Sequence, residues 1–362
     1  MNPTDPALAA ANVTGPVLVT GVAGFIGHAV AHRLLDRGEQ VIGLDVVNDY
    51  YDPALKHARL ATFEGLPEFE FHRLDVADAA AVAALVRSRG VRRVVHLAAQ
   101  AGVRYSIENP FAYERSNLAG HLAVLEACRH AEGFEHLVYA SSSSVYGERP
   151  LAGPDGRACQ EGGAGGFSED DPATEPVSLY AATKRSCELM SQSYASLYGL
   201  PQTGLRFFTV YGPWGRPDMA YFGFTRKIFA GEPIEVYGEG RMARDFTYID
   251  DIVDGVLGAL DNVPGAGGVK ARAHRVLNIG DSRPVGLMDM IEALEAALGR
   301  KAQKIMRPMQ PGDVTATYAD VSKLQAICGY HPRVMLEEGL QRFADWYRQF
   351  YDVESLQSQE AE

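Results

Sequence analysis

The chain has 362 residues and a formal net charge of −12, from 46 Asp+Glu against 34 Lys+Arg. With 46% hydrophobic and 22% charged residues its composition is that of an ordinary globular protein, and its length exceeds the roughly 250–300 residues of one hydrophobic core, so we expect two lobes. The acidity argues against a protein that binds nucleic acid or an anionic membrane, because both partners need a basic face.

The cysteines and the first residues give no sign of export or metal binding. Four Cys are scattered along the chain without a C-x-x-C pair, which predicts neither a disulfide framework nor a metal site. The first 16 residues have no basic segment, and no stretch approaches the ~20 apolar residues that span a bilayer. We therefore expect a cytoplasmic protein without membrane, nucleic-acid or metal partners.

The first half of the chain alternates short apolar runs with helical patterns. The runs typical of buried strands are 17–20, 41–45, 69–74, 91–97, 137–141 and 202–207, and helical spacing appears at 25–35, 79–88, 111–131 and 178–198. Such alternation produces a parallel sheet with helices on both faces. We expect a disordered segment 1–14 and then a Rossmann-type, doubly wound α/β domain over 15–205, with a mobile surface loop at 148–171.

The pattern changes after about residue 205, where Pro and Gly interrupt it. A strand leading into a turn is expected at 236–240, and helices are expected at 252–260, 287–298, 322–328 and 336–350. We expect a smaller mixed α/β lobe over 206–350, with some segments returning to the first domain. It would cap the carboxyl ends of the strands, where open α/β sheets bind ligands. The polar tail 351–362 is expected to be frayed.

Three glycines lie where the first predicted strand meets the first helix. The stretch 20–27 reads TGVAGFIG, which suits a tight turn, close approach of a pyrophosphate and a helix N-terminus that offers N–H groups. Asp45 ends the next strand, eighteen residues after Gly27, where a carboxylate accepts hydrogen bonds from an adenosine ribose and repels a 2′-phosphate. A glycine motif alone is weak, but the combination predicts a dinucleotide site that favours NAD over NADP.

Tyr180 and Lys184 are four residues apart on a predicted helix, so the phenol and the ammonium share one face. The ammonium favours the phenolate form, which would suit Tyr180 to general base catalysis. A surface polar pair is the alternative, because a chain with 17 Tyr meets this spacing easily by chance. The serines at 141–144 follow a strand and are also compatible with a polar loop. Their coincidence with the glycine turn favours a catalytic site of Tyr180, Lys184 and Ser142.

The spacing G-x-x-G-x-x-G resembles that of the extended short-chain dehydrogenase/reductases. The resemblance implies that Asp75 and Val76 contact the adenine, that residues 97–99 form a wall beside the cofactor, and that Asn117 supports the active site from behind. The implied NAD site consists of Gly21, Gly24, Phe25, Ile26, Gly27, Asp45, Asp75, Val76, Leu97, Ala98, Ala99, Asn117, Tyr180, Lys184 and Phe207.

Longer motifs narrow the resemblance and extend it from Val17 to about Phe350. These motifs are NDYYD at 48–52, HLAAQAGVR at 96–104, SSVYG at 143–147, SLYAATK at 178–184, RFFTVYGPWGRPDMA at 206–220 and QPGDV at 310–314. Together they resemble UDP-glucuronate 4-epimerases. The implied reaction passes through a 4-keto sugar with tightly bound NAD as the hydride acceptor. Tyr180 would take the proton of the sugar 4-OH, Ser142 would bond the same oxygen, and Lys184 would hold Tyr180 ionised.

The residues after Ser142 separate the relatives by reaction. Ser143 and Ser144 stand where nucleotide-sugar dehydratases carry an Asp-Glu pair and where decarboxylases carry a Glu, so a base for elimination is missing. Arg216 is the main candidate for the sugar carboxylate, with an ordinary loop arginine as the alternative. The resemblance implies uracil contact by Tyr237, diphosphate contact by Arg244 and ribose contact by Asp313. The expected substrate set is Arg104, Ser142, Ser143, Ser144, Thr209, Arg216, Tyr237, Arg244 and Asp313, and Arg104 is equally compatible with a structural ion pair.

Three other functions stay open at this point. Within enzymes these are another nucleotide-sugar 4-epimerase of the UDP-glucose/galactose type and a UDP-glucuronate decarboxylase. From a different class, a non-catalytic NAD-binding protein has the same fold, although intact Ser142, Tyr180 and Lys184 argue against it. Relatives commonly dimerise through helices that correspond to 111–131 and 178–198, so we expect a homodimer.

Overall fold

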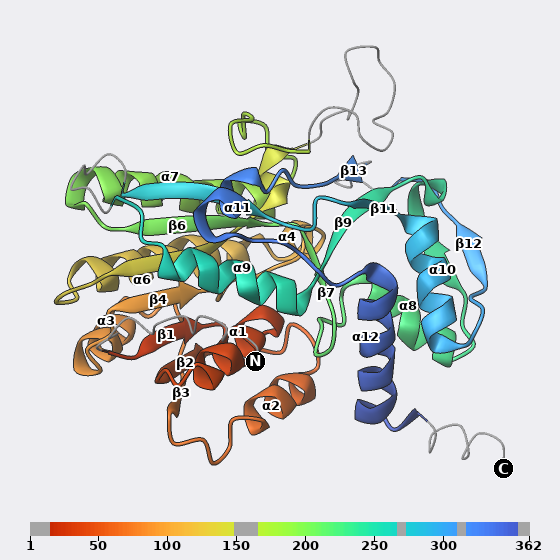
Figure 1. The fold of residues 1–362 in the computed structure, drawn as a ribbon, viewed down its shortest axis with the longest axis horizontal. Helices are drawn as coiled ribbons and strands as arrows, with labels where there is room; N and C mark the ends of the chain where they lie inside the picture. Colours follow the sequence, from red (N-terminus) through yellow and green to blue (C-terminus); the bar gives the residue numbers. More distant parts are fainter. Residues whose placement is uncertain (1–14, 148–165, 266–272, 310–315, 354–362) are drawn as a thin grey trace, which may run out of the picture.

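A computed structural model describes residues 15–147, 166–265, 273–309 and 316–353. At its centre lies a seven-stranded parallel sheet with the order β10-β6-β5-β4-β1-β2-β3 (Figure 1). The strands are β1 Val17–Thr20, β2 Val41–Asp45, β3 Phe69–Arg73, β4 Arg93–His96, β5 His136–Ser142, β6 Gln202–Phe207 and β10 His274–Ile279. Because the strand order reverses at β1, between β2 and β4, the carboxyl edge there is a switch point at which such sheets bind ligands.

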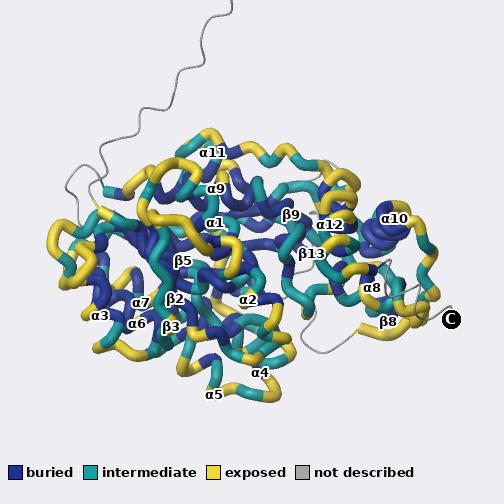
Figure 2. Tube along the Cα trace, turned by 90° about the horizontal axis from the view of Figure 1, so that it is seen from below, coloured by how far each residue is buried: buried dark blue, intermediate teal, exposed yellow. Residues whose placement is uncertain are grey.

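Alternate residues of the central strands point into two separate hydrophobic cores. Val17 and Val19 belong to the core under helices α1 (Phe25–Asp36) and α9 (Ile249–Asp261). Leu18 belongs to the core on the opposite face, which is covered by α3 Ala79–Ser88, α6 Gly120–Arg129 and α7 Leu179–Tyr198. The dark central layer in Figure 2 is this doubly covered sheet. The Rossmann-type, doubly wound α/β fold predicted from the alternation is confirmed.

The second lobe packs at the carboxyl edge of the large sheet. Its strands are β7 Thr209–Tyr211, β9 Ala243–Tyr248, β11 Pro284–Gly286 and β13 Ala316–Thr317 in one sheet, and β8 Ile234–Val236 and β12 Lys304–Met306 in another. Its helices α8 Ala220–Phe229, α10 Leu287–Leu298 and α12 Leu336–Phe350 lie together on one side in Figure 1. The division is not consecutive in sequence, because β10 pairs with β6 in the large sheet and α11 (Ser322–Cys328) packs beside it.

The structure differs from the sequence-based expectations at several elements. The helix expected at 111–131 is present and continuous over 110–129, but its middle is a π-helical turn, η1 Glu114–Ala119, between α5 Pro110–Tyr113 and α6. The helices α2 Pro53–Ala61, α4 Tyr105–Glu108 and α8 were not anticipated. The start of α2 does carry a recognisable signal, since Asp52 caps it through Ala54 N at 2.9 Å and Pro53 follows.

The prediction of a mobile surface loop at 148–171 is wrong near the C-terminal end of this range. Phe167 is buried, its N–H donates to Tyr318 O at 2.9 Å, and it bridges to Ala319. An aromatic side chain that finds a core contact overrides the local composition, which is rich in Gly and acids. Residues 148–165 lie outside the described residues. The tail expected to fray from 351 is wrong at its start, because Val353 is buried; residues 354–362 lie outside the described residues.

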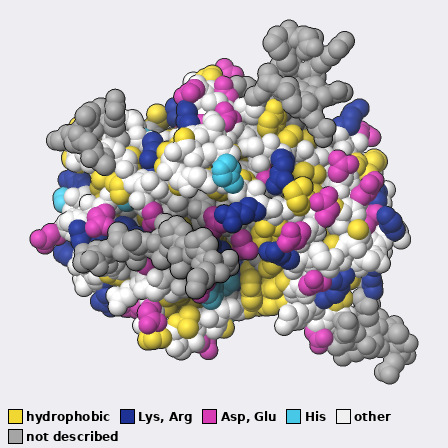
Figure 3. Space-filling model, in the orientation of Figure 1, with side chains coloured by type: hydrophobic (Ala, Val, Ile, Leu, Met, Phe, Trp, Pro, Cys, Tyr) yellow, Lys and Arg dark blue, Asp and Glu magenta, His cyan; other side chains and the backbone are white. Residues whose placement is uncertain are grey.

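Charged side chains of both signs are interspersed over the face of the molecule drawn in Figure 3. Among the described helices, none is both long enough and apolar enough to cross a membrane.

Candidate active site

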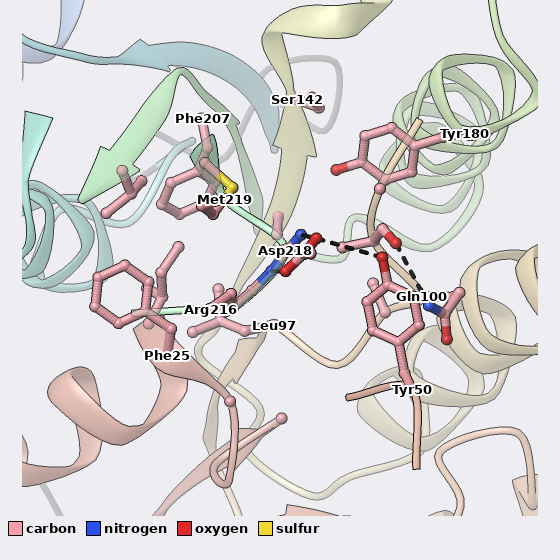
Figure 4. Close-up of a pocket in the computed structure, with 18 of the residues that line it drawn as sticks. Phe25, Tyr50, Leu97, Gln100, Ser142, Tyr180, Phe207, Arg216, Asp218 and Met219 are labelled. Carbon is pink, nitrogen blue, oxygen red and sulfur yellow. Dashed lines mark hydrogen bonds and ion pairs between the residues drawn. The ribbon is translucent and has the colours of Figure 1, made fainter. Parts of the chain in front are cut away.

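A cavity of about 840 Å³ lies at the carboxyl edge of the large sheet and is lined by both lobes. The predicted site residues along its wall are Gly21, Gly24, Phe25, Ile26, Gly27, Asp45, Asp75, Val76, Leu97, Ala98, Ala99, Arg104, Ser142, Ser143, Ser144, Tyr180, Lys184, Phe207, Thr209, Arg216 and Tyr237. Figure 4 shows Tyr180 and Ser142 on one side of this cavity and the group Arg216, Asp218 and Tyr50 beside them. The structure therefore brings most of the predicted cofactor, catalytic and substrate residues to one place.

The glycine turn has no room for side chains. Gly21 has φ +76°, and a Cβ there would lie 2.8 Å from Ala98 N, while a Cβ on Gly27 would lie 2.1 Å from Gly21 O. Gly24 precedes α1, and no side chain caps the helix. The first N–H groups of α1 therefore remain available to an anion, and the backbone can approach it closely.

Asp45 lies at the end of β2, next to this turn. Its carboxylate accepts hydrogen bonds from Ala23 N at 3.1 Å and Val47 N at 2.8 Å, so its orientation is fixed before any ligand arrives. Burial raises the pKa of Asp45, and the two N–H groups and nearby Lys56 act in the opposite direction. A cradle that a Cβ would fill, an uncapped helix N-terminus and a carboxylate at the end of the second strand fit a dinucleotide with an unmodified ribose.

Two predicted cofactor residues have partners within the protein. Asp75 lines the cavity and pairs with Arg115 at 2.7 Å. Asn117 lies in the π-helical turn, outside the cavity wall, and is buried. Its amide accepts from Gln100 N at 2.8 Å and donates to Thr183 Oγ1 at 3.0 Å, so it ties the loop after β4 to the helix of Tyr180.

The catalytic candidates are held by α7 and the end of β5. Ser178 caps α7 by accepting from Ala181 N at 3.1 Å, so the helix starts just before Tyr180. Lys184, one turn later, is buried and donates its Nζ to Ala140 O of β5 at 2.8 Å. The Tyr180 hydroxyl points into the cavity (Figure 4). The phenol and the ammonium thus share the helix face that meets β5.

The serines after β5 form a small cluster of hydroxyl groups. Ser142 Oγ accepts from Ser144 N at 3.2 Å and from Ser144 Oγ at 2.9 Å. Ser141 points away from the cluster and donates to Glu188 Oε1 at 2.6 Å. Glu188 also pairs with Arg206, and no sequence argument had singled out either of these two residues. The one available signal was spacing, since Glu188 follows Lys184 by one helical turn.

Arg216 lies in the cavity wall as expected, but it is not free. Its Nε and Nη2 donate to the two carboxylate oxygens of Asp218 at 3.0 and 2.5 Å. Tyr50 donates its hydroxyl to the same carboxylate at 3.3 Å (Figure 4). Burial alone would lower the pKa of Arg216, but Asp218 raises it overall. Sequence reasoning had missed Asp218 and Tyr50 as members of this group.

The expected nucleotide residues are brought together only in part. The Arg104 guanidinium lies 5.4 Å from the centre of the Tyr237 ring, so a residue of the first lobe contacts one of the second across the cavity. Arg244 donates to its neighbour's carbonyl, Ala243 O, at 2.9 Å and does not line the cavity. Asp313 lies outside the described residues. Within the described ranges, no group of three or more His, Cys, Asp and Glu is arranged to hold a metal ion.

Comparisons with known proteins show that the chain is similar to a family of enzymes. Residues 17–280 match the model of the NAD dependent epimerase/dehydratase family. The chain is 48% identical over 345 residues to UDP-glucuronate 4-epimerase 3 of Arabidopsis thaliana, covering 93% of this chain and 77% of that protein. It is 45% identical over 346 residues to a probable UDP-glucuronate 4-epimerase of Rhizobium meliloti, covering 92% and 97%.

The fold of the chain is also similar to that of solved structures. The UDP-glucuronic acid 4-epimerase of Bacillus cereus, solved in complex with UDP-glucuronic acid and NAD, superposes with a TM-score of 0.81 at 33% identity. The alignment covers 93% of this chain and all of the Bacillus chain.

Proposed function

The chain belongs to the NAD dependent epimerase/dehydratase family, and we propose that it interconverts UDP-glucuronate and UDP-galacturonate by NAD-dependent inversion at C4. The observation that carries this proposal is the cavity itself. One wall carries the glycine turn and Asp45, and another carries Tyr180 with Ser142. The relatives named above supply the substrate class, since the Arabidopsis and Bacillus proteins are UDP-glucuronate 4-epimerases.

NAD would be held by the N-terminal turn of α1, by Asp45 and by the residues after β3 and β4, and when bound it supplies a reversible hydride acceptor for C4. The protein's part is to move and hold one proton. Tyr180 would take the proton of the 4-OH, and Ser142 would bond the same oxygen. Lys184, one helical turn after Tyr180, has its ammonium oriented by Ala140 O.

The hydroxyl cluster argues against the dehydratase and decarboxylase alternatives. A dehydratase needs a carboxylate next to the catalytic hydroxyl to remove the C5 proton, whereas Ser143 and Ser144 are neutral donors. Neutral donors suit a sugar that already carries a carboxylate, because a second carboxylate would repel it. The serines therefore favour a 4-epimerase over a dehydratase and over a decarboxylase.

The sugar carboxylate would be bound by Arg216, with Ser143, Ser144 and Thr209 as further donors. Nε and Nη2 of Arg216 each donate one N–H to Asp218, so the second N–H of Nη2 and the two of Nη1 are the donors left for the substrate. A 4-keto-uronic acid is a β-keto acid, which loses CO₂ when its carboxylate is desolvated or turned across the carbonyl plane. Donors that keep the carboxylate hydrogen-bonded would protect the intermediate. We expect Arg216→Ala to lower turnover and to release UDP-pentose, and unchanged turnover without UDP-pentose would contradict this role.

The activity is tested by incubating the purified protein with UDP-glucuronate and separating the products. UDP-galacturonate is the expected product, formed to equilibrium from either side. UDP-xylose or UDP-arabinose would indicate decarboxylation instead. Conversion of UDP-glucose at an equal rate would indicate the broader epimerase. No turnover, with NAD still bound, would indicate the non-catalytic alternative.

A homodimer is the state in which we expect the protein to work, in the cytoplasm. Large apolar side chains are exposed on α5 and α7, among them Phe111, which is 80% exposed, Leu189 and Leu197 (Figure 2 shows α5 at the surface). A second copy would cover such a face. Light scattering should give twice the chain mass, and Leu189→Glu should give the monomer. The free thiols of Cys128, Cys187 and Cys328 support a reducing compartment.

A further inference from the structure

Arg59 joins two segments that are far apart in the sequence. It lies on α2 and is fully buried. Its Nη1 donates to Ala23 O in the glycine turn at 2.9 Å and to the Tyr51 hydroxyl at 2.7 Å. Its Nε and Nη2 donate to Trp214 O at 3.2 and 2.6 Å, and Nη2 also reaches Gly215 O at 3.1 Å. One side chain therefore fixes the cofactor turn to the loop of the second lobe.

The acceptors of Arg59 are unusual for a buried arginine. Burying a guanidinium is costly, and a carboxylate partner is the common way to offset that cost. Each of the five hydrogen bonds named above instead ends on an uncharged oxygen, four of them on main-chain carbonyls. Arg59 therefore holds main-chain segments in place through hydrogen bonds to their carbonyls.

The segment that Arg59 holds is strained and tightly packed. Trp214 has φ +62°, a left-handed conformation that costs energy for a residue with a side chain. Its ring packs against Trp346 at 5.3 Å and Phe350 at 5.2 Å between ring centres. Gly215 has no room for a Cβ, which would lie 1.9 Å from the Tyr221 hydroxyl.

Arg216 follows this segment directly and lies in the cavity wall, whereas Arg59 does not line the cavity. The position of Arg216 therefore depends on Trp214 and Gly215, and their carbonyls are fixed by Arg59. The same guanidinium is bonded to Ala23, within the turn that would bind the NAD phosphates.

We propose that Arg59 is a positioning residue that couples the cofactor turn to Arg216, so that recognition of the sugar carboxylate depends on it. The identity of the ligand rests on the proposed function. Two consequences of this role of Arg59 can be measured separately. Replacing the Arg59 guanidinium should weaken binding of the carboxylate-bearing sugar more than binding of UDP. It should also change the surroundings of Trp214.

Arg59→Lys tests the inference, with Arg275→Lys as the matched control. Arg275 also donates to main-chain carbonyls, Ala259 O and Asn262 O, but it lies away from the cavity. For Arg59→Lys we expect the KM for UDP-glucuronate to rise at least about tenfold while the Kd for UDP changes less than about twofold, because UDP lacks the carboxylate that Arg216 would bind. For Arg275→Lys both constants should stay within about twofold of wild type.

Tryptophan fluorescence gives a readout that does not depend on turnover. The chain has two Trp, and Trp214 contacts Trp346 directly. Arg59→Lys should therefore change the emission spectrum of the folded protein, and Arg275→Lys should leave it as in wild type. Failure of the proposed function appears in the wild-type protein, as absent turnover of UDP-glucuronate, and leaves this fluorescence comparison intact.

Two results would overturn the inference. One is a folded Arg59→Lys protein with wild-type emission and wild-type KM for UDP-glucuronate. The other is an equal loss of affinity for UDP and UDP-glucuronate, which indicates general damage. If Arg59→Lys does not fold, Gly215→Ala replaces it, since this variant keeps Arg59 and displaces the same segment against Tyr221. It should give the same selective rise in KM, and an unchanged KM would overturn the inference.

Discussion

Glu188 and Arg206 form a two-point ion pair directly behind the serines, with Oε1–Nε and Oε2–Nη2 distances of 2.8 Å each. Both side chains are buried, and Glu188 also accepts the Ser141 hydroxyl. Burial alone would raise the pKa of Glu188, but Arg206 and Ser141 hold it below its usual value. The pair fastens α7, which carries Tyr180, to β6, and the Ser141 hydroxyl joins Glu188 to β5, which ends at Ser142.

Breaking this pair from one side should destabilise the protein strongly. Glu188→Gln leaves the Arg206 charge buried without a carboxylate, and we expect a loss of about 3–5 kcal/mol in the free energy of unfolding, measured with urea. The exposed pair Glu70–Arg89 is the control, because Glu70→Gln should change stability little. A loss for Glu188→Gln as small as that of the control would mean that the pair does not fasten the helix.

Tyr180→Phe should remove most of the activity and leave the fold intact. Without the phenol no group accepts the 4-OH proton, so kcat should fall by about 10²–10⁴. NAD content and urea midpoint should stay as in wild type. Tyr105→Phe is the matched control, since this tyrosine also lines the cavity but its hydroxyl accepts from Asn109 at 2.9 Å. A similar fall in both variants would contradict a special role for Tyr180.

Asp218→Asn should weaken substrate recognition selectively. The carboxylate holds two nitrogens of Arg216, and one charge-assisted hydrogen bond is worth about 1.5–3 kcal/mol, so the KM for UDP-glucuronate should rise about tenfold or more. Tyr50→Phe removes only the 3.3 Å contact to Asp218 and should change KM less than about threefold. Equal effects of the two variants would show that Asp218 does not orient Arg216.

Acid should destabilise the protein well before the carboxylates are fully protonated. Burial lowers the pKa of His28 and His96 to about 3 and that of His136 to about 4. The folded pKa of each histidine is below its unfolded value of 6.5. The stabilising effect of the neutral histidines is therefore complete above pH 6.5 and is lost as the pH falls from 6.5 toward their folded pKa values of about 3 to 4. Each contributes up to about 1.4 kcal/mol per pH unit.

Buried carboxylates with a raised pKa, among them Asp245, act in the opposite direction. Burial raises the pKa of Asp245 to about 6, so its contribution is complete below its unfolded pKa of 3.8 and is lost as the pH rises to 6. The pH dependence of Asp245 offsets that of one histidine only between pH 3.8 and about 6. Urea unfolding at several pH values should therefore show stability falling from pH 6.5 to 4.5, and constant stability over this interval would contradict the buried neutral histidines.

Local patterns were sufficient to predict part of the fold and site. The glycine turn, the end of β2 at Asp45 and the spacing of Tyr180 and Lys184 are each fixed within one or two elements, where strand and helix periodicity decide which side chains share a face. The sheet could be predicted for the same reason, because β and α segments alternate regularly.

Side-chain contacts between distant segments could not be predicted in this way. Arg59 finds its acceptors 36 and 155 residues along the chain from itself, and Glu188 meets Arg206 from another element. The burial of Phe167 and the pairing of Arg216 with Asp218 likewise depend on tertiary packing. Arg59, Phe167 and Arg216 lie where the sequence predicts neither helix nor strand, and only the folded chain brings them to their partners.

We propose that Tyr180 serves a reaction in which the C4 hydrogen leaves the sugar and returns to its other face. UDP-glucuronate labelled with deuterium at C4 tests this most directly when the UDP-galacturonate formed in ordinary water is examined by NMR and mass spectrometry. We predict that the label stays at C4 of the product and that none appears in solvent. Loss of the label to solvent, or its retention only in unreacted substrate while UDP-pentose accumulates, would contradict the account.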